Sequence, residues 1–318
     1  MKRLGIFLSL GILLTLCGLA QASLSCNSCA YVTAGNLVYA WDPTANTMTQ
    51  VANFPLVIDS LVFDKSGNII ASADQSGRAL YKFDTTAQTY STLISNLGTY
   101  LGDLAMDPSG GSVLVSDRGS SSQKGAIYRI DLTTNQSSIF YNGGMYPGGI
   151  IFDNSGNFFA VLGPATNKGS VIAQIDQNGN VIKQVSIPNG GDGLTFNATT
   201  LQLYVGSTGG FYTVPTDLSV ANFTPVSNIG SVDGVGTSGN FVYMVHYSGN
   251  AYQYNLNNNQ ITATSRQVNN IDDIAPLSGF GSINPPAEHH FFSQSYDDQR
   301  GRQFNAEMDD HQCKQRQH

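Results

Sequence analysis

Residues 61–84 read LVFDKSGNIIASADQSGRALYKFD, and this stretch decides the fold. Its first half is an apolar run that ends in the turn sequence Asp64-Lys-Ser-Gly67, and its second half carries Gly77, Tyr81 and Asp84. An Asp-x-x-Gly sequence is typical of a tight turn, because the Asp side chain bonds the backbone ahead of it and the Gly accepts a positive φ. The stretch therefore predicts consecutive antiparallel strands joined by short turns.

Both halves of this stretch recur along the chain. The Asp-x-x-Gly turn returns at residues 107–110 and 153–156. The Gly-Tyr-Asp pattern occurs six times, with last residues 39 to 47 positions apart, at Asp42, Asp84, Asp131, Asp176, Pro215 and Asn255. A period of about 40 to 45 residues built from short strands is the signature of a β-propeller with one four-stranded blade per repeat. We therefore predict an all-β, six-bladed propeller of four-stranded antiparallel blades.

The repeat also predicts the strands of a blade and the way the ring closes. One full blade has its innermost strand at residues 61–63, followed by strands at 69–73, 79–83 and 89–94. The N-terminal strands, near residues 31–33 and 37–41, lack an innermost partner, and residues 271–276 supply one from the other end of the chain. A blade shared between N- and C-terminal strands closes the ring without an open sheet edge.

The two ends of the chain differ from the propeller between them. Residues 1–22 are predicted to be a signal peptide, since Lys2 and Arg3 precede an apolar run and an A-x-A site at residues 20–22. An uncleaved anchor is the alternative for this run. We expect an exported protein, periplasmic or secreted, with the propeller at residues 23–279 and no membrane span after cleavage. Residues 280–318 are a polar tail with too few apolar residues to form a core, and disorder is expected there.

The charge and the cysteines limit the partners and the compartment. The chain carries a formal charge of −7, and loss of Lys2 and Arg3 lowers it by two. Such a chain has no basic surface for nucleic acid, and we expect a monomer that suits cations, neutral sugars or small molecules. Three cysteines remain after cleavage, Cys26, Cys29 and Cys313, and export favours a structural disulfide whose pairing the sequence leaves open.

An acidic residue stands just before nearly every predicted innermost strand, at Asp59, Asp103, Asp192, Asp233 and the pair Asp272 and Asp273. Only the blade with Pro147-Gly148-Gly149 departs from the pattern. Because innermost strands begin on one face of a propeller, these carboxylates should converge on the central channel. There they repel one another unless a cation, a proton or a hydrogen-bond donor compensates.

Two interpretations of these acids follow. Oxygen ligands suit Ca²⁺ or Mg²⁺ better than zinc, so the first is a cation site, with Ca²⁺ ahead of other divalent cations and no organic cofactor. Its predicted ligands are Asp59, Asp192, Asp233 and Asp272. In the second, each Asp caps its own inter-blade loop by accepting backbone N–H groups.

The ends of the second strands should lie on the same face, farther from the axis. Ligand contacts are predicted there for Asp74, Asp117, Ser207 and His246, and for Arg118 in the loop at residues 118–124. His246 is the only histidine within the propeller. For His246 the alternative is a hydrogen-bonded structural histidine, and for Arg118 a solvated loop charge.

The repeat of inner strand, Asp-x-x-Gly turn and Gly-x-x-Tyr-x-x-Asp resembles the NHL-repeat propellers and the gluconolactonase / senescence-marker-protein family. In the latter, an Asn-Gly or Asp-Gly pair before adjacent inner strands supplies metal ligands, and Asp192-Gly193 and Asp233-Gly234 resemble those pairs. Asp59 stands where the family carries a metal-binding glutamate. Gly148-Gly149 departs from the family's polar substrate-contacting residue.

Two functions follow from these observations. The first is an exported propeller that binds a small molecule, glycan or protein loop at its acidic face. The alternative, which the resemblance implies, is a metal-dependent lactonase or esterase with Asp103 or His246 as general base.

Overall fold

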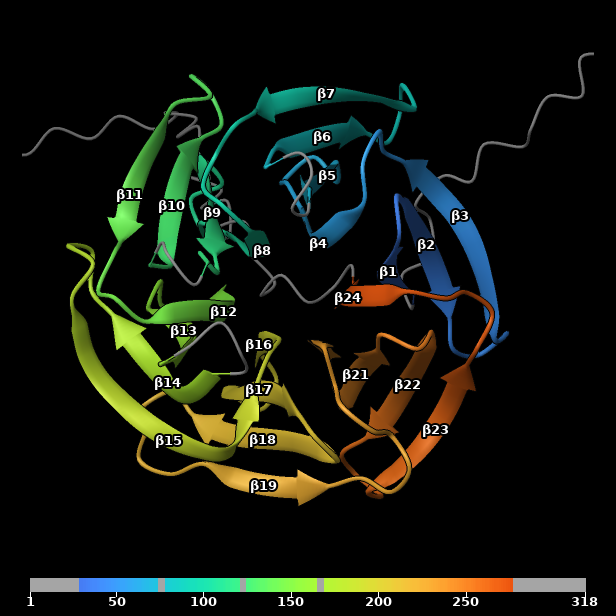
Figure 1. Cartoon of the computed structure of the whole chain (residues 1–318). Helices are drawn as coiled ribbons and strands as arrows, with labels where there is room; N and C mark the ends of the chain where they lie inside the picture. The colour runs from blue at the N-terminus through green and yellow to red at the C-terminus, as the bar shows by residue number, and fades with distance from the viewer. Residues whose placement is uncertain (1–28, 74–77, 121–123, 165–168, 277–318) are drawn as a thin grey trace, which may run out of the picture. The chain divides into compact units, whose positions relative to one another are not determined.

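The computed structural model describes residues 29–73, 78–120, 124–164 and 169–276. They form six four-stranded antiparallel sheets arranged in a ring (Figure 1). Within the described residues, no helix is long and apolar enough to cross a membrane. The predicted six-bladed propeller is confirmed.

Each of five blades is built from four consecutive strands. In chain order these are β4 (Ile58–Phe63), β5 (Ile69–Ala73), β6 (Leu80–Asp84) and β7 (Thr89–Ile94); β8 (Leu101–Met106), β9 (Ser112–Asp117), β10 (Ala126–Asp131) and β11 (Ser137–Tyr141); β12 (Tyr146–Phe152), β13 (Phe158–Gly163), β14 (Gly169–Ile175) and β15 (Val181–Gly191); β16 (Leu194–Asn197), β17 (Gln202–Ser207), β18 (Gly210–Pro215) and β19 (Asn222–Pro225); and β20 (Gly234–Ser238), β21 (Phe241–His246), β22 (Asn250–Asn255) and β23 (Gln260–Ser265).

The sixth blade joins the two ends of the described chain. It contains β1 (Ala30–Ala34), β2 (Leu37–Asp42), β3 (Thr47–Asn53) and the C-terminal strand β24 (Ile271–Pro276), in the order β24-β1-β2-β3. β24 pairs with β1 in antiparallel register, with Tyr31 opposite Ala275 and Val32 opposite Ile274. The predicted shared blade is therefore confirmed.

The core lies between neighbouring blades. Aromatic and branched side chains from one sheet pack on the next, as between the shared blade and the blade of β4 to β7, where the Tyr31 and Phe63 rings meet edge to face with 4.9 Å between their centroids. Trp41 is fully buried and contacts Tyr243 of the preceding blade, with 6.2 Å between ring centroids. This packing holds the inner strands around the central axis and positions whatever side chains precede them.

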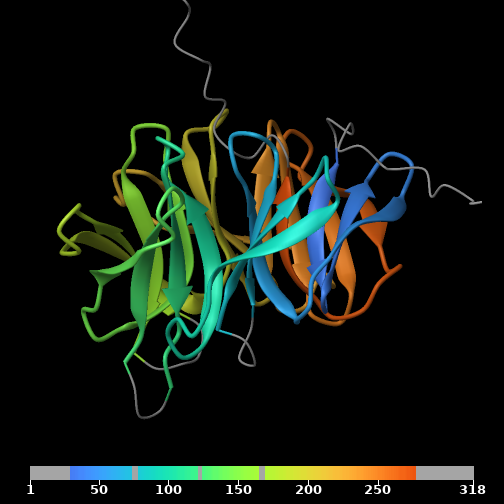
Figure 2. The same ribbon diagram turned by 90° about the horizontal axis from the view of Figure 1, so that it is seen from above.

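The alternation of strand direction sorts the connections onto two opposite faces of the ring (Figure 2). We call the face where the innermost strands begin the pore face. The other is the turn face, which carries the Asp-x-x-Gly turns. In the first of these turns Asp64 Oδ1 accepts the N–H groups of Ser66 at 2.8 Å and Asn68 at 2.9 Å, while Gly67 adopts a φ of 78°. The turn acids thus act as predicted, within their own turns.

Candidate functional site

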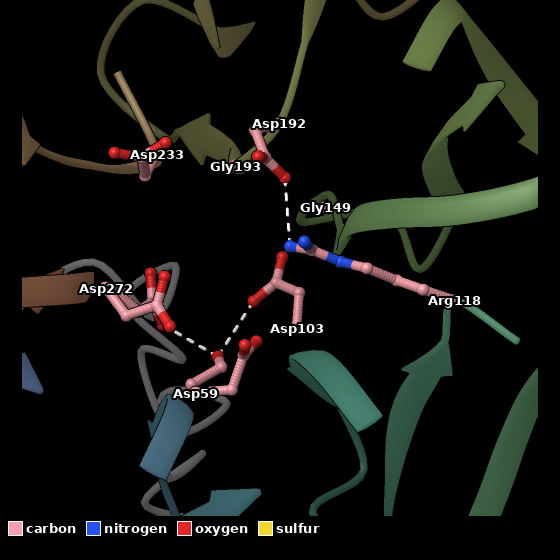
Figure 3. Close-up of a pocket in the computed structure, with 10 residues that line it drawn as sticks. Asp59, Asp103, Arg118, Gly149, Asp192, Gly193, Asp233 and Asp272 are labelled. Atoms are coloured by element: carbon pink, nitrogen blue, oxygen red, sulfur yellow. Dashed lines mark hydrogen bonds and ion pairs between the residues drawn. The ribbon is translucent and has the colours of Figure 1, made fainter. Parts of the chain in front are cut away.

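The acids predicted to precede the innermost strands meet at one cavity on the pore face. Asp192 and Asp233 do precede β16 and β20, whereas the other four lie within the first residues of β4, β8 and β24. The cavity has a volume of about 20 Å³, and Figure 3 shows the side chains around it. It is lined by Asp59, Ser60, Asp103, Arg118, Gly149, Asp192, Gly193, Asp233, Asp272 and Asp273. A space of this size holds about one water molecule. All six acids that the repeat singled out are present, together with Arg118.

Arg118 supplies a positive charge within this acidic ring. It directly follows β9, and its Nη2 lies 3.0 Å from Oδ1 of Asp192. Its side chain is 29% exposed and that of Asp192 is 18% exposed, so the pair is mostly shielded from water. The pKa of the Arg118 guanidinium is raised above its ordinary value, first by Asp192 and then by Asp59 and Asp272. Arg118 is thus the internal cation of the cavity.

The Arg118 side chain is held by an aromatic ring and a glycine. Its guanidinium carbon lies 5.7 Å from the centre of the Tyr100 ring, a cation–π distance. A Cβ atom on Gly102 would lie 3.3 Å from Arg118 Nε and 3.0 Å from Ser116 Oγ. Gly102 therefore leaves the space through which the arginine reaches the cavity.

Asp103 and Asp273 tie neighbouring blades together. Asp103 Oδ2 accepts the backbone N–H of Ile150 in the next blade at 2.8 Å, and Asp273 Oδ2 accepts that of Leu61 at 3.2 Å. Each acid also accepts the N–H of the residue that follows it. These two acids thus accept backbone N–H groups, as in the predicted alternative, and they do so from the neighbouring blade as well as from their own segment.

The Ser60 hydroxyl bridges these two acids. Ser60 Oγ lies 2.9 Å from Asp103 Oδ1 and 2.7 Å from Asp273 Oδ2. One hydroxyl has a single hydrogen to donate, so the two carboxyl groups compete for it. Burial raises the pKa of both acids, and for Asp103 the neighbouring Asp273 carboxylate raises it further.

Asp272 is the third acid with a raised pKa. Burial, followed by the nearby Asp59 carboxylate, raises the pKa of Asp272 to about 9, although Arg118 opposes the shift. Asp272 is therefore protonated at neutral pH. The cavity balances its six carboxyl groups with protons, one guanidinium and backbone donors.

The four predicted metal ligands do not fit a divalent cation. The Arg118 guanidinium interacts with Asp59, Asp192 and Asp272, and Asp233 Oδ2 accepts the backbone N–H of Tyr247 at 2.7 Å. Ca²⁺ requires six to eight oxygen ligands, and a fixed guanidinium among them repels it. Across the described ranges, no group of three or more His, Cys, Asp or Glu side chains is arranged to hold a metal ion.

Close packing between inner strands accounts for Gly149 and for Gly193, the glycine of one Asp-Gly pair that resembles a gluconolactonase metal position. The N–H of Gly193 donates to the carbonyl of Asp233 at 2.9 Å, and that of Gly149 donates to the carbonyl of Asp192 at 2.9 Å. A Cβ on Gly193 would lie 2.9 Å from the Asp233 carbonyl oxygen, and one on Gly149 only 2.4 Å from the backbone N of Leu194. Glycine is required because adjacent blades touch backbone to backbone here.

Asp117 and Ser207, two residues predicted to contact a ligand, have structural roles away from the cavity. Asp117 is fully buried and accepts the N–H groups of Thr99, Tyr100 and Gly119 at 2.8 to 3.0 Å. Ser207 is also fully buried and donates to the Gly190 carbonyl at 2.6 Å. Neither lines the cavity or reaches solvent. Asp74 lies outside the described residues.

His246 does not line the cavity either. Its Nδ1 accepts the N–H of Ser248 at 3.0 Å and lies 2.7 Å from the Ser248 hydroxyl. The other predicted base, Asp103, has both oxygens engaged by backbone N–H groups. We therefore derive no catalytic step from these residues.

The sequence predicts Arg118 on the correct face, but it does not predict that this arginine balances the charge of the cavity carboxylates. A signal was present: of the residues that directly follow a predicted second strand, Arg118 is the only basic one. Six converging carboxylates require a compensating charge, and this arginine directly follows a strand that ends on the same face. The roles of Ser60 and Gly102 had no such signal, since both depend on contacts that follow no repeat.

Cys29 is disulfide-bonded and 6% exposed. Cys26 and Cys313, the cysteines with which the sequence could pair it after cleavage, lie outside the described residues, so its pairing stays a prediction.

Comparisons with known proteins support the fold. No known protein family matches the sequence, and no curated protein matches it. A chain in the crystal structure of a nidogen–laminin complex is similar in structure, with a TM-score of 0.65 and 16% identity over 78% of this chain and 97% of that one. A protein of unknown function from Bacteroides caccae has a TM-score of 0.60 and 13% identity over 78% and 98%. At these identities the likeness establishes the propeller, and the gluconolactonase and NHL resemblances stay predictions beyond that shared fold.

Proposed function

We propose that this chain is an exported, non-catalytic propeller that binds a protein partner across its pore face. The observation that carries the proposal is the state of the central cavity, which has a volume of about 20 Å³ and holds the Arg118 side chain. A sugar or lactone needs a pocket of a few hundred cubic ångströms. A ligand of this face must therefore lie over the cavity and the surrounding loops, as a protein surface does.

The residues around the cavity suit such a surface. Tyr247 is 58% exposed, and its backbone N–H bonds Asp233 of the cavity wall. Val57, 47% exposed, stands two residues before Asp59. Tyrosine is enriched in the centres of protein interfaces, because it offers a large contact area at little entropic cost. The similar nidogen–laminin chain also comes from a complex between proteins.

Two features support export. The first 22 residues have the basic end, apolar run and A-x-A site of a signal peptide. The disulfide bond of Cys29 is of the kind that persists in oxidising compartments.

Site-specific photo-crosslinking in the source cells tests the proposal. A photoreactive phenylalanine analogue would replace Val57 or Tyr247 on the pore face, and Leu201 or Val220 on the turn face as matched controls, since these are 62% and 45% exposed. We expect one discrete protein adduct from the pore-face positions and none from the controls. Tyr247→Ala should then weaken binding of the identified partner about tenfold, while Leu201→Ala leaves it unchanged.

Adducts from the turn face alone would contradict the proposal. So would metal-dependent hydrolysis of a lactone by the purified protein, abolished by EDTA.

A further inference from the structure

The cavity contains the elements by which proteins recognise a guanidinium group. Asp192 accepts a hydrogen bond from Arg118 at 3.0 Å, the Tyr100 ring faces the guanidinium carbon at 5.7 Å, and Gly102 leaves space beside Nε. A carboxylate and an aromatic face are the two partners that favour a planar guanidinium over an ammonium ion. Tyr100, Gly102 and Arg118 belong to the blade of β8 to β11, whereas Asp192 directly precedes β16 of another blade, so the fold assembles the site.

The backbone that carries Arg118 is fixed independently of its side chain. Arg118 N–H donates to the carbonyl of Tyr100 at 2.8 Å, and buried Asp117 accepts the N–H groups on both sides of this contact, from Tyr100 at 2.8 Å and Gly119 at 2.9 Å. Removal of the Arg118 side chain should therefore leave the walls of the site in place.

The Arg118 side chain does not use all of its hydrogen-bond donors. Arg118 Nε is buried, and among the described residues it has no hydrogen-bond partner. A free guanidinium ion is not held by a side-chain stem, so it can turn to place more of its N–H groups on the surrounding carboxylates. The site therefore has unused capacity for this class of cation.

We infer that the pore is a guanidinium-binding site that the chain fills with its own Arg118, and that it takes a monosubstituted guanidinium from solution when that side chain is removed. The ligand class is an alkylguanidinium, the group at the end of an arginine side chain. This inference is independent of the proposed partner, because it concerns only the walls of the cavity.

Thermal unfolding of the full chain with Arg118→Ala, titrated with methylguanidinium, tests the inference. We expect millimolar methylguanidinium to raise the Tm of this variant by about 3 °C at ten times its Kd. Methylammonium at the same concentration should give less than a third of that rise, since it lacks the planar fork. Wild type, with its site filled, should show no rise.

Arg129→Ala is the matched control. Arg129 also stacks on an aromatic ring, 5.1 Å from the centre of Phe140, and its Nε is also buried, but it does not line the cavity. This variant reports any general effect of methylguanidinium and should show no rise in Tm.

The inference is overturned if Arg118→Ala responds no more than Arg129→Ala, or responds equally to methylammonium. If Arg118→Ala does not fold alone, the yield of soluble protein on refolding becomes the measurement. A yield that methylguanidinium raises for this variant and not for Arg129→Ala supports the inference, and an unchanged yield overturns it.

Discussion

The two faces of the propeller use aspartate in opposite ways. On the turn face, Asp131 and Asp176 accept backbone N–H groups within their own turns, and those bonds lower their pKa values. On the pore face, Asp103 and Asp273 accept N–H groups from neighbouring blades, and burial raises their pKa values. A periodic aspartate is thus a local turn former at one end of a strand and a long-range connector at the other. Substitutions at matched positions test this difference.

Glycines at two positions of one blade should show the largest contrast. Gly149→Ala places a Cβ 2.4 Å from the backbone N of Leu194, and backbone cannot move aside as a side chain can. We expect a loss of more than about 3 kcal/mol in the free energy of unfolding, measured with urea. Gly156→Ala on the turn face meets no atom within 4 Å, and its φ of 80° should cost about 1 kcal/mol. Equal losses would show that the blades are not in close backbone contact.

Asp103 within β8 and Asp107 directly after it sharpen the comparison. Asp103→Ala removes the acceptor of the Ile150 and Leu104 N–H groups and of Ser60, leaving donors in the wall of the cavity unpaired. We expect a loss of about 3 kcal/mol. Asp107→Ala removes the acceptor of Ser109 N–H in a turn that water reaches, and about 1 kcal/mol is expected. Urea unfolding of both variants measures the difference, and a larger loss for Asp107→Ala would contradict the contrast.

The pH dependence of stability should also differ between the faces. Asp272 keeps its proton in the folded chain up to about pH 9, whereas the unfolded chain loses it near pH 4. The folded state then holds more protons than the unfolded state between these values, so stability falls as pH rises through this window. The urea midpoint should drop between pH 5 and pH 9, by an amount equivalent to about 2 kcal/mol.

Asp272→Asn is the control for this effect, since it removes the titrating group and should flatten the profile. An unchanged slope would show that the acid does not hold its proton.

The turn acids change stability with pH in the opposite direction, because Asp64 has a lowered pKa. Burial alone would raise this pKa, but hydrogen bonds from Lys82 and Asn68 outweigh that effect. Its contribution is present above about pH 4 and is lost as pH falls below that value.

The repeat predicted the fold well because its signals are local and periodic. The strands predicted at residues 69–73, 89–94 and 271–276 have those bounds in β5, β7 and β24. The convergence of Asp59, Asp103, Asp192, Asp233 and Asp272 followed from strand direction alone. Arg118 was harder, since it pairs with an acid 74 positions away, and no periodicity links an inserted loop to a distant strand.

The pairing of β24 with β1 has a consequence for how the protein is made. These strands lie at opposite ends of the described chain, and Val32 meets Ile274 only after nearly all of the propeller has been synthesised. A chain delivered N-terminus first therefore keeps one strand edge of the shared blade exposed until the last strand arrives. During biogenesis that edge is where a wrong strand could pair and where a chaperone would have to act.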